Sequence, residues 1–514
     1  MTPNFMSKFL LLPRPLLFLL IHAGTLNAQN QVLVLNQSLS LVSNNLPNPP
    51  TFSIPASSTP LTISIAFCET PQQDGPRFFV TNDTGIGDPG PGSGGDVFEI
   101  TVGENGMGNV TLDSISNGGT FAVTAGTSQL SFEVGLSDSG PLHSQLTSLP
   151  LLGDSTNNQA LLFSPPFLPV NPSDPTYPNY TLPLGNITQP PPPDSSQTPN
   201  FTLILGPTTS FPTFDASNNV LSNNFPMTAC ALRNVSNLVV GESTNPPANA
   251  QASLWLRDSD GWRTQWIVSG LDSITNYTAY VVQDGTKIAG PTYFRTKTAI
   301  FSCPLVHSLP FCPSTSYSVP LPPPPGTAVT TYDASNFPSD VSDPLIQYMT
   351  NFTVTLLTFA CGRDWYSPLQ TCADCQRAYR TWLCAVQLPR CGEIPDTTTS
   401  ASTPQSSSID SGAQVVFPAV LSQPKGDIAR NTNLPNATGD WVELLPCLES
   451  CNAADRACPN FLGFMCPVPR FNAASSYGVG FIDGDEKDKG SDWEQDGGMT
   501  GLSQDRWGHV WCNG

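Results

Sequence analysis

Cysteine is the residue type with the clearest chemical potential in this chain of 514 residues. Cys372 and Cys375 form a Cys-x-x-Cys pair, and Cys447 and Cys451 are spaced almost as closely. Such a pair at a helix start can be a redox centre, because that position lowers the pKa of a thiol, and both spacings also suit zinc. A thioredoxin-like site needs a buried strand before the pair, which this region lacks, and the chain has only 4 His. We therefore expect structural disulfides in preference to redox or zinc chemistry.

All the cysteines are expected to be disulfide-bonded, and neither a metal nor a cofactor is predicted. Their number, 14, is even, and 12 of them lie at or after residue 303, as in small secreted domains stapled by disulfides. The two in the first half, Cys68 and Cys230, are expected to pair with each other. The predicted disulfide-bonded residues are Cys68, Cys230, Cys303, Cys312, Cys361, Cys372, Cys375, Cys384, Cys391, Cys447, Cys451, Cys458, Cys466 and Cys512.

Serine and histidine form no recognisable catalytic arrangement. Ser93 lies between Gly92 and Gly94, but Pro91 occupies a position at which a nucleophile elbow requires glycine. The sequence around His143 identifies no partners for acid–base catalysis. We therefore predict no catalytic residues and a protein that is not an enzyme.

Charged residues are few, and most of them are acidic. The chain has 20 Lys and Arg against 40 Asp and Glu, a net charge of −20. Charged residues make up 12% of it, about half of the roughly 25% that is usual. So few cations cannot neutralise a nucleic-acid backbone, which excludes a nucleic-acid partner. The acidic segment 483–496 carries carboxylates that attract Ca²⁺, but it lacks the spacing of an EF-hand loop, and we interpret it as a solvated loop.

Residues 1–28 have the features of a cleaved signal peptide. Lys8 precedes the apolar run Phe9–Ile21, and small residues lead to a plausible cleavage point after Ala28. The run is short and interrupted by proline, so it does not suit a membrane of roughly 30 Å hydrocarbon thickness. We expect the chain to enter the secretory pathway and to be soluble or held at a membrane by a partner.

Asn-x-Ser/Thr sequons support the same compartment, because N-glycans are added to surface asparagines in the secretory pathway. The predicted glycosylation sites are Asn36, Asn82, Asn109, Asn179, Asn186, Asn200, Asn234, Asn276, Asn351 and Asn436.

The first half of the chain has the pattern of antiparallel sheets. Apolar residues alternate with polar ones in short runs such as 61–67 and 130–134, separated by Gly, Asn and Asp. Proline-rich residues between such runs cannot continue a sheet, because proline lacks the backbone N–H. We predict a flexible lead-in over 29–60, a β-rich domain over 61–163, a Pro-rich linker over 164–200 and a fibronectin-like β-sandwich over 201–300. In the last of these, the spacing of Leu271, Thr275 and Tyr277 resembles the corner between strands E and F of fibronectin type III domains.

The remainder, 301–514, is predicted to be a cysteine-rich helical domain. Asp343 and Pro344 favour a helix start, and further helices are expected over 371–386 and 446–457, with a disordered loop at about 395–415. The predicted fold class is therefore a mainly β N-terminal half, with one or two β-sandwich-like domains, and a C-terminal disulfide-rich, mostly helical domain.

One segment of this helical domain carries a specific resemblance. The run from Tyr366 to Cys391, which includes Cys372, Cys375 and Cys384, resembles the cysteine-rich domain of the fungal stretch-activated calcium-channel regulatory subunit, of the mating-induced-death family. The later cysteines up to residue 466 fit the second cluster of that family. The resemblance is specific over about 361–466, and the domain is similar to frizzled-type domains.

The resemblance implies an extracellular auxiliary subunit of a voltage-gated-type calcium channel that supports calcium influx. Its partner would be the pore-forming calcium-channel α-subunit, and it would be peripheral to the membrane through that partner. The expected location is the extracellular face of the plasma membrane, with the endoplasmic reticulum as a second location in the secretory pathway. The alternative hypothesis is a secreted cell-wall or adhesion glycoprotein with a frizzled-like ligand-binding domain. Aromatic residues and arginine are enriched at interface cores, so the candidate interface residues are Tyr366, Arg377, Arg380, Trp382 and Arg390.

Overall fold

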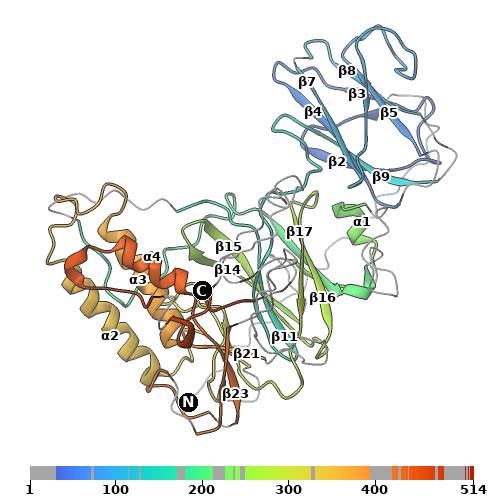
Figure 1. Ribbon diagram of the computed structural model, residues 1–514. Helices are drawn as coiled ribbons and strands as arrows, with labels where there is room; N and C mark the ends of the chain where they lie inside the picture. Colours follow the sequence, from blue (N-terminus) through green and yellow to red (C-terminus); the bar gives the residue numbers. More distant parts are fainter. Residues whose placement is uncertain are drawn as a thin grey trace, which may run out of the picture.

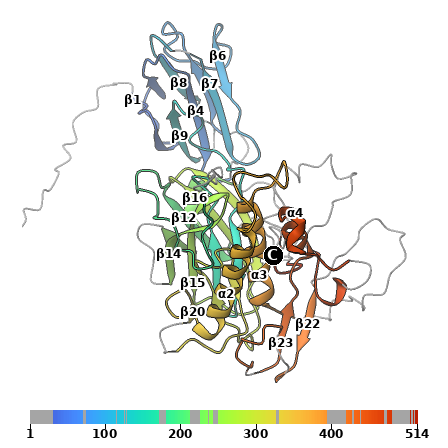
Figure 2. The ribbon, with the colours of Figure 1, turned by 90° about the vertical axis from the view of Figure 1, so that its left-hand side faces the viewer.

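The computed structural model contains two β-sandwiches followed along the chain by a disulfide-rich helical part (Figure 1). Figure 1 and Figure 2 both place the first sandwich at one end of the second, with the helical part beside the second. The predicted signal peptide over 1–28, the predicted loop at about 395–415, the acidic segment 483–496 and Asn179 lie outside the described residues. The structure describes residues 31–70, 75–113, 115–124, 126, 129–170, 180–211, 226–235, 238–242, 249–325, 330–393, 419–426, 430–437, 439–468, 473–479, 504, 508 and 510–514.

The first sandwich packs two sheets around an aromatic core. One sheet has the strand order β1-β3-β8-β5-β6 and the other β2-β9-β4-β7. The ring of Phe78 lies 5.1 Å from that of Phe132 and 6.2 Å from that of Phe121, so the core joins both sheets. The strands are β1 (Gln31–Val32), β2 (Gln37–Val42), β3 (Thr51–Ile54), β4 (Leu61–Phe67), β5 (Arg77–Thr81), β6 (Val97–Ile100), β7 (Met107–Leu112), β8 (Gly119–Thr124) and β9 (Ser131–Ser137).

Residues 31–54 belong to this sandwich, whereas the sequence predicted a flexible lead-in over 29–60. Strand β2 pairs with β9 from Gln37 to Val42, and β3 pairs with β8. Phe52, on β3, is fully buried in the core. The segment is rich in Asn, Ser and Pro, and its hydrogen-bond partners lie far along the chain. Only the paired sheets make it a stable part of the fold.

The second sandwich has an immunoglobulin-like strand order. Its sheets run β10-β11-β15-β14 and β13-β12-β16-β17, which corresponds to strands A-B-E-D and C′-C-F-G. The core contains Trp266, Leu203 and Val281 from both sheets. The elements are β10 (Leu151–Ser155), β11 (Gln159–Phe163), β12 (Phe201–Pro207), η1 (Thr208–Ser210), α1 (Ala229–Arg233), β13 (Val239–Glu242), β14 (Ala250–Asp258), β15 (Gly261–Ser269), β16 (Asn276–Gln283) and β17 (Lys287–Arg295).

The predicted corner between strands E and F is present. The hydroxyl of Tyr277, at the start of β16, accepts a hydrogen bond from the backbone N–H of Asp272 at 2.9 Å. This is the tie expected of a tyrosine corner. It holds the turn between β15 and β16 in place.

The Pro-rich segment 164–200 connects two strands of the same sandwich, and not two domains as the sequence suggested. Strand β11, before the segment, pairs with β15 from Gln159 to Phe163, so β10 and β11 belong with the strands after residue 200. The proline run does end a strand, as expected, but a strand's partner cannot be read from its own residues. Part of the segment contacts the helical part, where Gly185 N–H donates to Thr350 Oγ1 at 3.3 Å.

The helical part consists of α-helices beside two small three-stranded sheets, β19-β18-β20 and β21-β23-β22. Helix α3 has the capping box that its sequence encodes, with the Thr371 hydroxyl and the Asp374 carboxylate each accepting from the other residue's backbone N–H. Helix α2 begins earlier than predicted, so Pro344 lies inside it. The elements are β18 (Leu305–Val306), β19 (Tyr317–Ser318), β20 (Thr331–Tyr332), α2 (Ser339–Leu356), α3 (Cys372–Gln387), β21 (Arg390–Gly392), β22 (Val420–Gln423), β23 (Trp441–Leu444), α4 (Leu448–Ala457), η2 (Asn460–Leu462) and η3 (Ala473–Ser475).

All the cysteines lie in described residues and are disulfide-bonded. The expected bond between Cys68 and Cys230 is present and links the first sandwich to α1. The other bonds staple the helical part: 303–391, 312–384, 361–372, 375–458, 447–512 and 451–466. In the part of the chain that the structure describes, no helix is both long and apolar enough to cross a membrane.

We predict that acid weakens the contact between the second sandwich and the helical part through His307. Burial lowers the pKa of His307 to about 4 from its usual 6.5, against the opposing charge of Asp333. Its Nε2 lies 3.2 Å from Thr331 Oγ1, and its Nδ1 lies 3.5 Å from Gln265 Nε2. The unfolded chain therefore binds this proton more readily. The stabilisation is complete above pH 6.5 and is lost as the pH falls toward 4, by up to about 3 kcal/mol.

Denaturant-induced unfolding at several pH values between about 7 and 4.5 measures this effect of His307. His307→Gln removes the titrating group, so the variant should lose this part of the pH dependence while the rest of the acid response stays. Curves of stability against pH that run parallel for the parent and the variant would contradict the prediction.

Candidate partner interface

The residues predicted from sequence to form an interface all lie in the helical part, but they do not form one surface. Tyr366 precedes α3, and Arg377, Arg380 and Trp382 lie on that helix, while Arg390 lies on β21. Three of these side chains have partners inside the protein.

The prediction that Arg390 lies at the interface is wrong, because this residue is buried and cannot meet a partner. Only 4% of the residue is exposed. Its Nη2 lies 3.1 Å from Asp154 Oδ1 and donates to the carbonyl of Gly153, also at 3.1 Å. Lys297 Nζ contacts the same carboxylate at 3.0 Å. Burial acts to raise the pKa of Asp154, but the charges of Arg390 and Lys297 outweigh it and lower the pKa to about 2. The arginine therefore locks β21 of the helical part to β10 of the second sandwich.

Tyr366 and Trp382 are also structural contacts. The hydroxyl of Tyr366 lies 2.6 Å from the carbonyl oxygen of Thr371 and 2.8 Å from that of Ala457. Burial raises the pKa of this hydroxyl, so it stays a donor. The indole of Trp382 donates to the hydroxyl of Tyr477 at 2.9 Å, and its ring packs against other aromatic rings. These two side chains hold the helices together, which the sequence could not distinguish from an interface role.

Arg377 and Arg380 stay candidates for the interface. The side chain of Arg377 is 45% exposed and lies 3.5 Å from Asp374 on the same helix. Arg380 is half-buried, and its Nε has no hydrogen-bond partner among the described residues. Burial, together with the neighbouring charge of Arg377, lowers the pKa of Arg380 to about 10.

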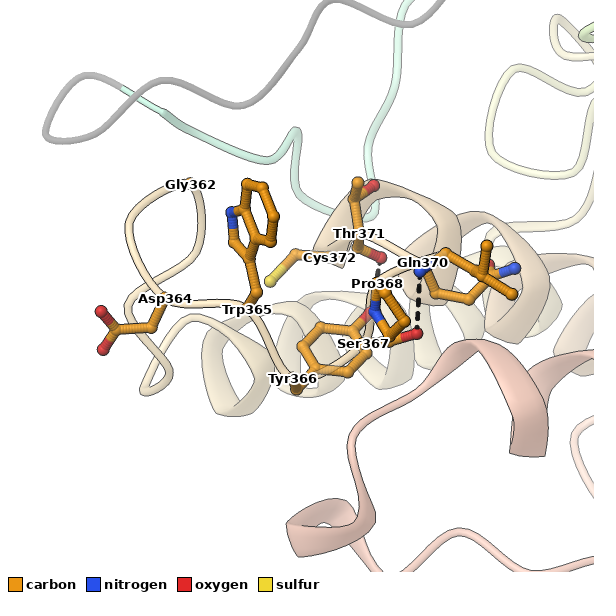
Figure 3. A pocket seen from close by; sticks show the side chains of 10 residues that line it. Gly362, Asp364, Trp365, Tyr366, Ser367, Pro368, Gln370, Thr371 and Cys372 are labelled. Atoms are coloured by element: carbon orange, nitrogen blue, oxygen red, sulfur yellow. Dashed lines mark hydrogen bonds between the residues drawn. The ribbon is translucent and has the colours of Figure 1, made fainter.

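A loop that the sequence analysis did not single out presents large apolar side chains to solvent. Trp365 and Leu369 are each 84% exposed. They lie in the loop between α2 and α3, which the Cys361–Cys372 disulfide closes. Figure 3 shows the indole of Trp365 directed away from the ring of Tyr366, between Gly362 and Cys372. We call Trp365, Leu369 and the neighbouring Phe461 the apolar tip.

Trp365 and Leu369 of the apolar tip line an open cavity of about 420 Å³, together with other loop residues between Gly362 and Cys372. Leu369 N–H donates to Ser367 Oγ at 3.2 Å across the loop (Figure 3). Phe461, which is 55% exposed, lies beside the loop because its ring stacks on that of Phe359 at 6.1 Å. The only sign of this exposed apolar loop in the sequence was a pair of large apolar residues within a short non-periodic segment between two cysteines.

The predicted glycosylation sites all lie on the surface where the structure describes them. Each of these nine asparagines is exposed, which glycosylation requires, although their use stays a prediction. Asn351 lies on α2, and Asn186 follows Gly185, which contacts the same helix. The sequence has no predicted site between Asn351 and Asn436, so none falls within the loop that carries the apolar tip.

His143 has partners that the sequence did not reveal, and their order resembles a catalytic triad. Its Nδ1 lies 3.0 Å from Ser64 Oγ, and its Nε2 lies 3.5 Å from Glu133 Oε2. Arg233, from α1, contacts the same carboxylate at 2.7 Å. Burial acts to raise the pKa of Glu133, but the hydrogen bond of His143 and the charge of Arg233 outweigh it and lower the pKa. Ser64 and His143 are buried, so a substrate cannot reach this serine, and the network instead joins the two sandwiches.

Two groups of cysteine and glutamate place potential metal-ligand atoms close together. In both groups the cysteine sulfurs form a disulfide with each other, so they offer no thiolate to a metal. The groups are Cys68, Glu133 and Cys230, and Cys447, Glu449 and Cys512.

Known proteins similar to this chain are fungal channel components. A protein named stretch-activated cation channel MID1 from Cryptococcus neoformans is 34% identical over 438 residues, which cover 80% of this chain and 68% of that protein. The stretch-activated cation channel yam8 of Schizosaccharomyces pombe is 32% identical over 52% of this chain and 49% of its own length. MID1 of Saccharomyces cerevisiae is 29% identical over 48% of this chain, and the match spans 45% of that relative.

The matches to solved structures are too weak to indicate a function for this chain. The match to the pre-peptidase C-terminal domain of a Bacillus anthracis collagenase covers 22% of this chain and 99% of that domain, at 11% identity and a TM-score of 0.15.

A family model of the stretch-activated Ca²⁺-permeable channel component Mid1 matches residues 60–490. With most of its length matched by this family and with the disulfide-rich helical part that the sequence resemblance implied, the chain belongs to the Mid1 family of stretch-activated Ca²⁺-permeable channel components.

Proposed function

We propose that this protein is a non-enzymatic auxiliary subunit of a voltage-gated-type calcium channel and supports calcium influx. It acts on the extracellular face of the plasma membrane, where it binds the pore-forming α-subunit and is peripheral to the membrane through that partner. Family membership supports the channel role, because the relatives are named channel components. The disulfides and the exposed sequon asparagines are consistent with the extracellular side.

The observation that carries this proposal is a helical part that is cross-linked by many disulfides and presents arginine side chains on α3. Disulfides such as Cys375–Cys458, which joins α3 to the end of α4, leave little of the surface to be ordered on binding, which lowers the entropic cost of association. Arg377 and Arg380 lie on one helix of that surface. We propose that they contact carboxylates of the α-subunit, because arginine forms strong paired hydrogen bonds with carboxylates.

Deletion of the gene should reduce stimulated calcium uptake by the cells at least severalfold, and the tagged chain should recover the α-subunit in mild detergent. Arg377→Ala with Arg380→Ala should lower that recovery while secretion and disulfide content stay normal. Glu449→Gln, on α4, serves as a control for surface charge. The alternative predicts that deletion leaves calcium uptake unchanged and that the chain is found in the medium or the cell wall without a membrane partner. These results would support a secreted wall or adhesion glycoprotein.

A further inference from the structure

We propose that the apolar tip is the anchor by which this protein holds its channel partner, and that its cavity receives an uncharged apolar or aromatic side chain from an extracellular loop of the α-subunit. This inference rests on the proposed function and names the chemistry of the contact. It differs from the contacts proposed for Arg377 and Arg380, which are polar and lie on α3.

The first argument is the unusual exposure of the tip. Trp365 and Leu369 are each 84% exposed, and Phe461 is 55% exposed. A clustered set of large apolar side chains in water is unfavourable, and such clusters mark interaction sites. Tryptophan in particular is enriched among the few residues that dominate binding energy at interfaces. The tip therefore has the composition of an interface core, and no described residue of its own chain covers it.

The second argument is the rigidity of the loop that carries the tip. The Cys361–Cys372 disulfide closes the loop at both ends. The hydroxyl of Tyr366 ties its middle to the carbonyl oxygens of Thr371 and Ala457. An apolar loop that served only as a loose connection would need none of these ties. Because the loop is already ordered, binding through Trp365 loses little conformational entropy.

The third argument concerns charge. Arg363 and Asp364, which flank Trp365, form two short hydrogen bonds with each other at 2.7 and 2.6 Å. Their charges therefore cancel, and the tip carries no net charge from this pair although the whole chain has a net charge of −20. The matching surface on a partner is uncharged and apolar, since a charged group placed there would be desolvated without an opposite charge.

The fourth argument distinguishes a protein partner from a lipid bilayer. A bilayer contact needs only protruding side chains, whereas this loop also lines an open cavity of about 420 Å³. That volume falls within the range of roughly 300–1,000 Å³ of pockets that bind specific ligands. A cavity beside protruding anchors suits a protein surface, which offers both a pocket for Trp365 and a side chain to fill the cavity. The absence of a sequon between Asn351 and Asn436 keeps glycans off this loop.

The test compares recovery of the detergent-solubilised α-subunit by the full-length tagged chain and its variants. Trp365→Ala combined with Leu369→Ser should reduce recovery roughly tenfold or more, as expected for interface anchors. Trp365→Phe keeps an aromatic anchor and should retain most of the binding. Tyr348→Ala is the matched control, because Tyr348 is also a large exposed aromatic of the helical part, 45% exposed on α2. It should change recovery less than twofold. Equal secretion and identical disulfide maps verify that all the variants fold.

The outcomes separate this inference from the proposed function. If the unchanged chain fails to recover the α-subunit, the proposed function is wrong and the tip has no such partner. If the unchanged chain recovers it and the Trp365→Ala, Leu369→Ser variant does so equally well, only the tip is overturned. A third outcome is that the purified chain binds protein-free phosphatidylcholine vesicles, and that the same variant abolishes this binding while α-subunit recovery is unchanged. This result would identify the bilayer as the occupant and would also overturn the proposal.

Discussion

Replacement of Arg390 by methionine is expected to lower the free energy of unfolding by about 3–5 kcal/mol, because it leaves a buried carboxylate with too little compensation. The carboxylate of Asp154 is buried and is contacted by both Arg390 and Lys297. Without the arginine, the lysine is the one remaining positive charge among the described contacts of this carboxylate, beside the backbone N–H groups of Ser155 and Ser318. The loss falls on the contact between β10 and β21, so the second sandwich and the helical part should separate more easily.

The pH dependence of this variant has a definite sign. The pKa of Asp154 is lowered from 3.8 to about 2, so its contribution to stability is present above pH 3.8 and is lost as the pH falls toward 2. In Arg390→Met the pKa of Asp154 should rise toward or above 3.8, so the loss of stability between pH 3.8 and 2 should become smaller or disappear. Denaturant unfolding followed by tryptophan fluorescence, at neutral and acid pH, measures both effects.

Arg377→Met is the matched control for Arg390→Met. The exposed arginine makes only an (i, i+3) contact with Asp374, and we expect a change within about 0.5 kcal/mol. If the two variants unfold at the same denaturant concentration, the buried ion pair does not stabilise the fold as argued.

Removal of the Cys375–Cys458 disulfide by replacement of both residues with alanine is the second change with a large expected effect. The bond joins α3 to α4 across a sequence separation of 83 residues. Chain-entropy arguments assign about 4.5 kcal/mol to a loop of this length. Alanine is chosen because both residues are buried and it adds no polar atom to the interior. We expect little of the variant to be secreted, and what is secreted to unfold at a lower temperature.

The Cys451–Cys466 disulfide offers a comparison within the same region. Its sequence separation is 15 residues, so the same argument assigns it about 3 kcal/mol. Its double-alanine variant should be the more stable of the two in thermal unfolding and should be secreted in larger amounts. The reverse order would show that local packing, and not loop length, determines the effect of these cross-links.

Patterns that depend on neighbouring residues were well predicted from the sequence. The alternation in 61–67 gives β4, the capping box at Thr371 and Asp374 begins α3, and the Tyr277 corner is formed as expected. Each of these depends on backbone geometry and hydrogen bonds within a few residues, which the local order of side chains specifies. The fold class, mostly β followed by a disulfide-rich helical part, follows from these local patterns.

Patterns that depend on distant residues were not predicted. The sequence of the strand at 159–163 predicts a buried strand whether its partner lies before or after the Pro-rich segment. Only its pairing with β15 assigns it to the second sandwich. His143 acquires Ser64 and Glu133 as neighbours through the sheet containing β4 and β9. For the interface, an arginine or an aromatic residue near a cysteine suits a surface and an interior equally well.

By itself, the amino-acid sequence determined that this chain is disulfide-bonded with strands first and helices later, and it identified the family by its cysteine spacing. Tertiary structure decided which cysteines pair, that Arg390 is buried against Asp154 and that Trp365 is exposed. The physical reason is that charge, hydropathy and local periodicity are properties of single residues and their neighbours. Burial and pairing depend instead on which distant segments the folded chain brings together.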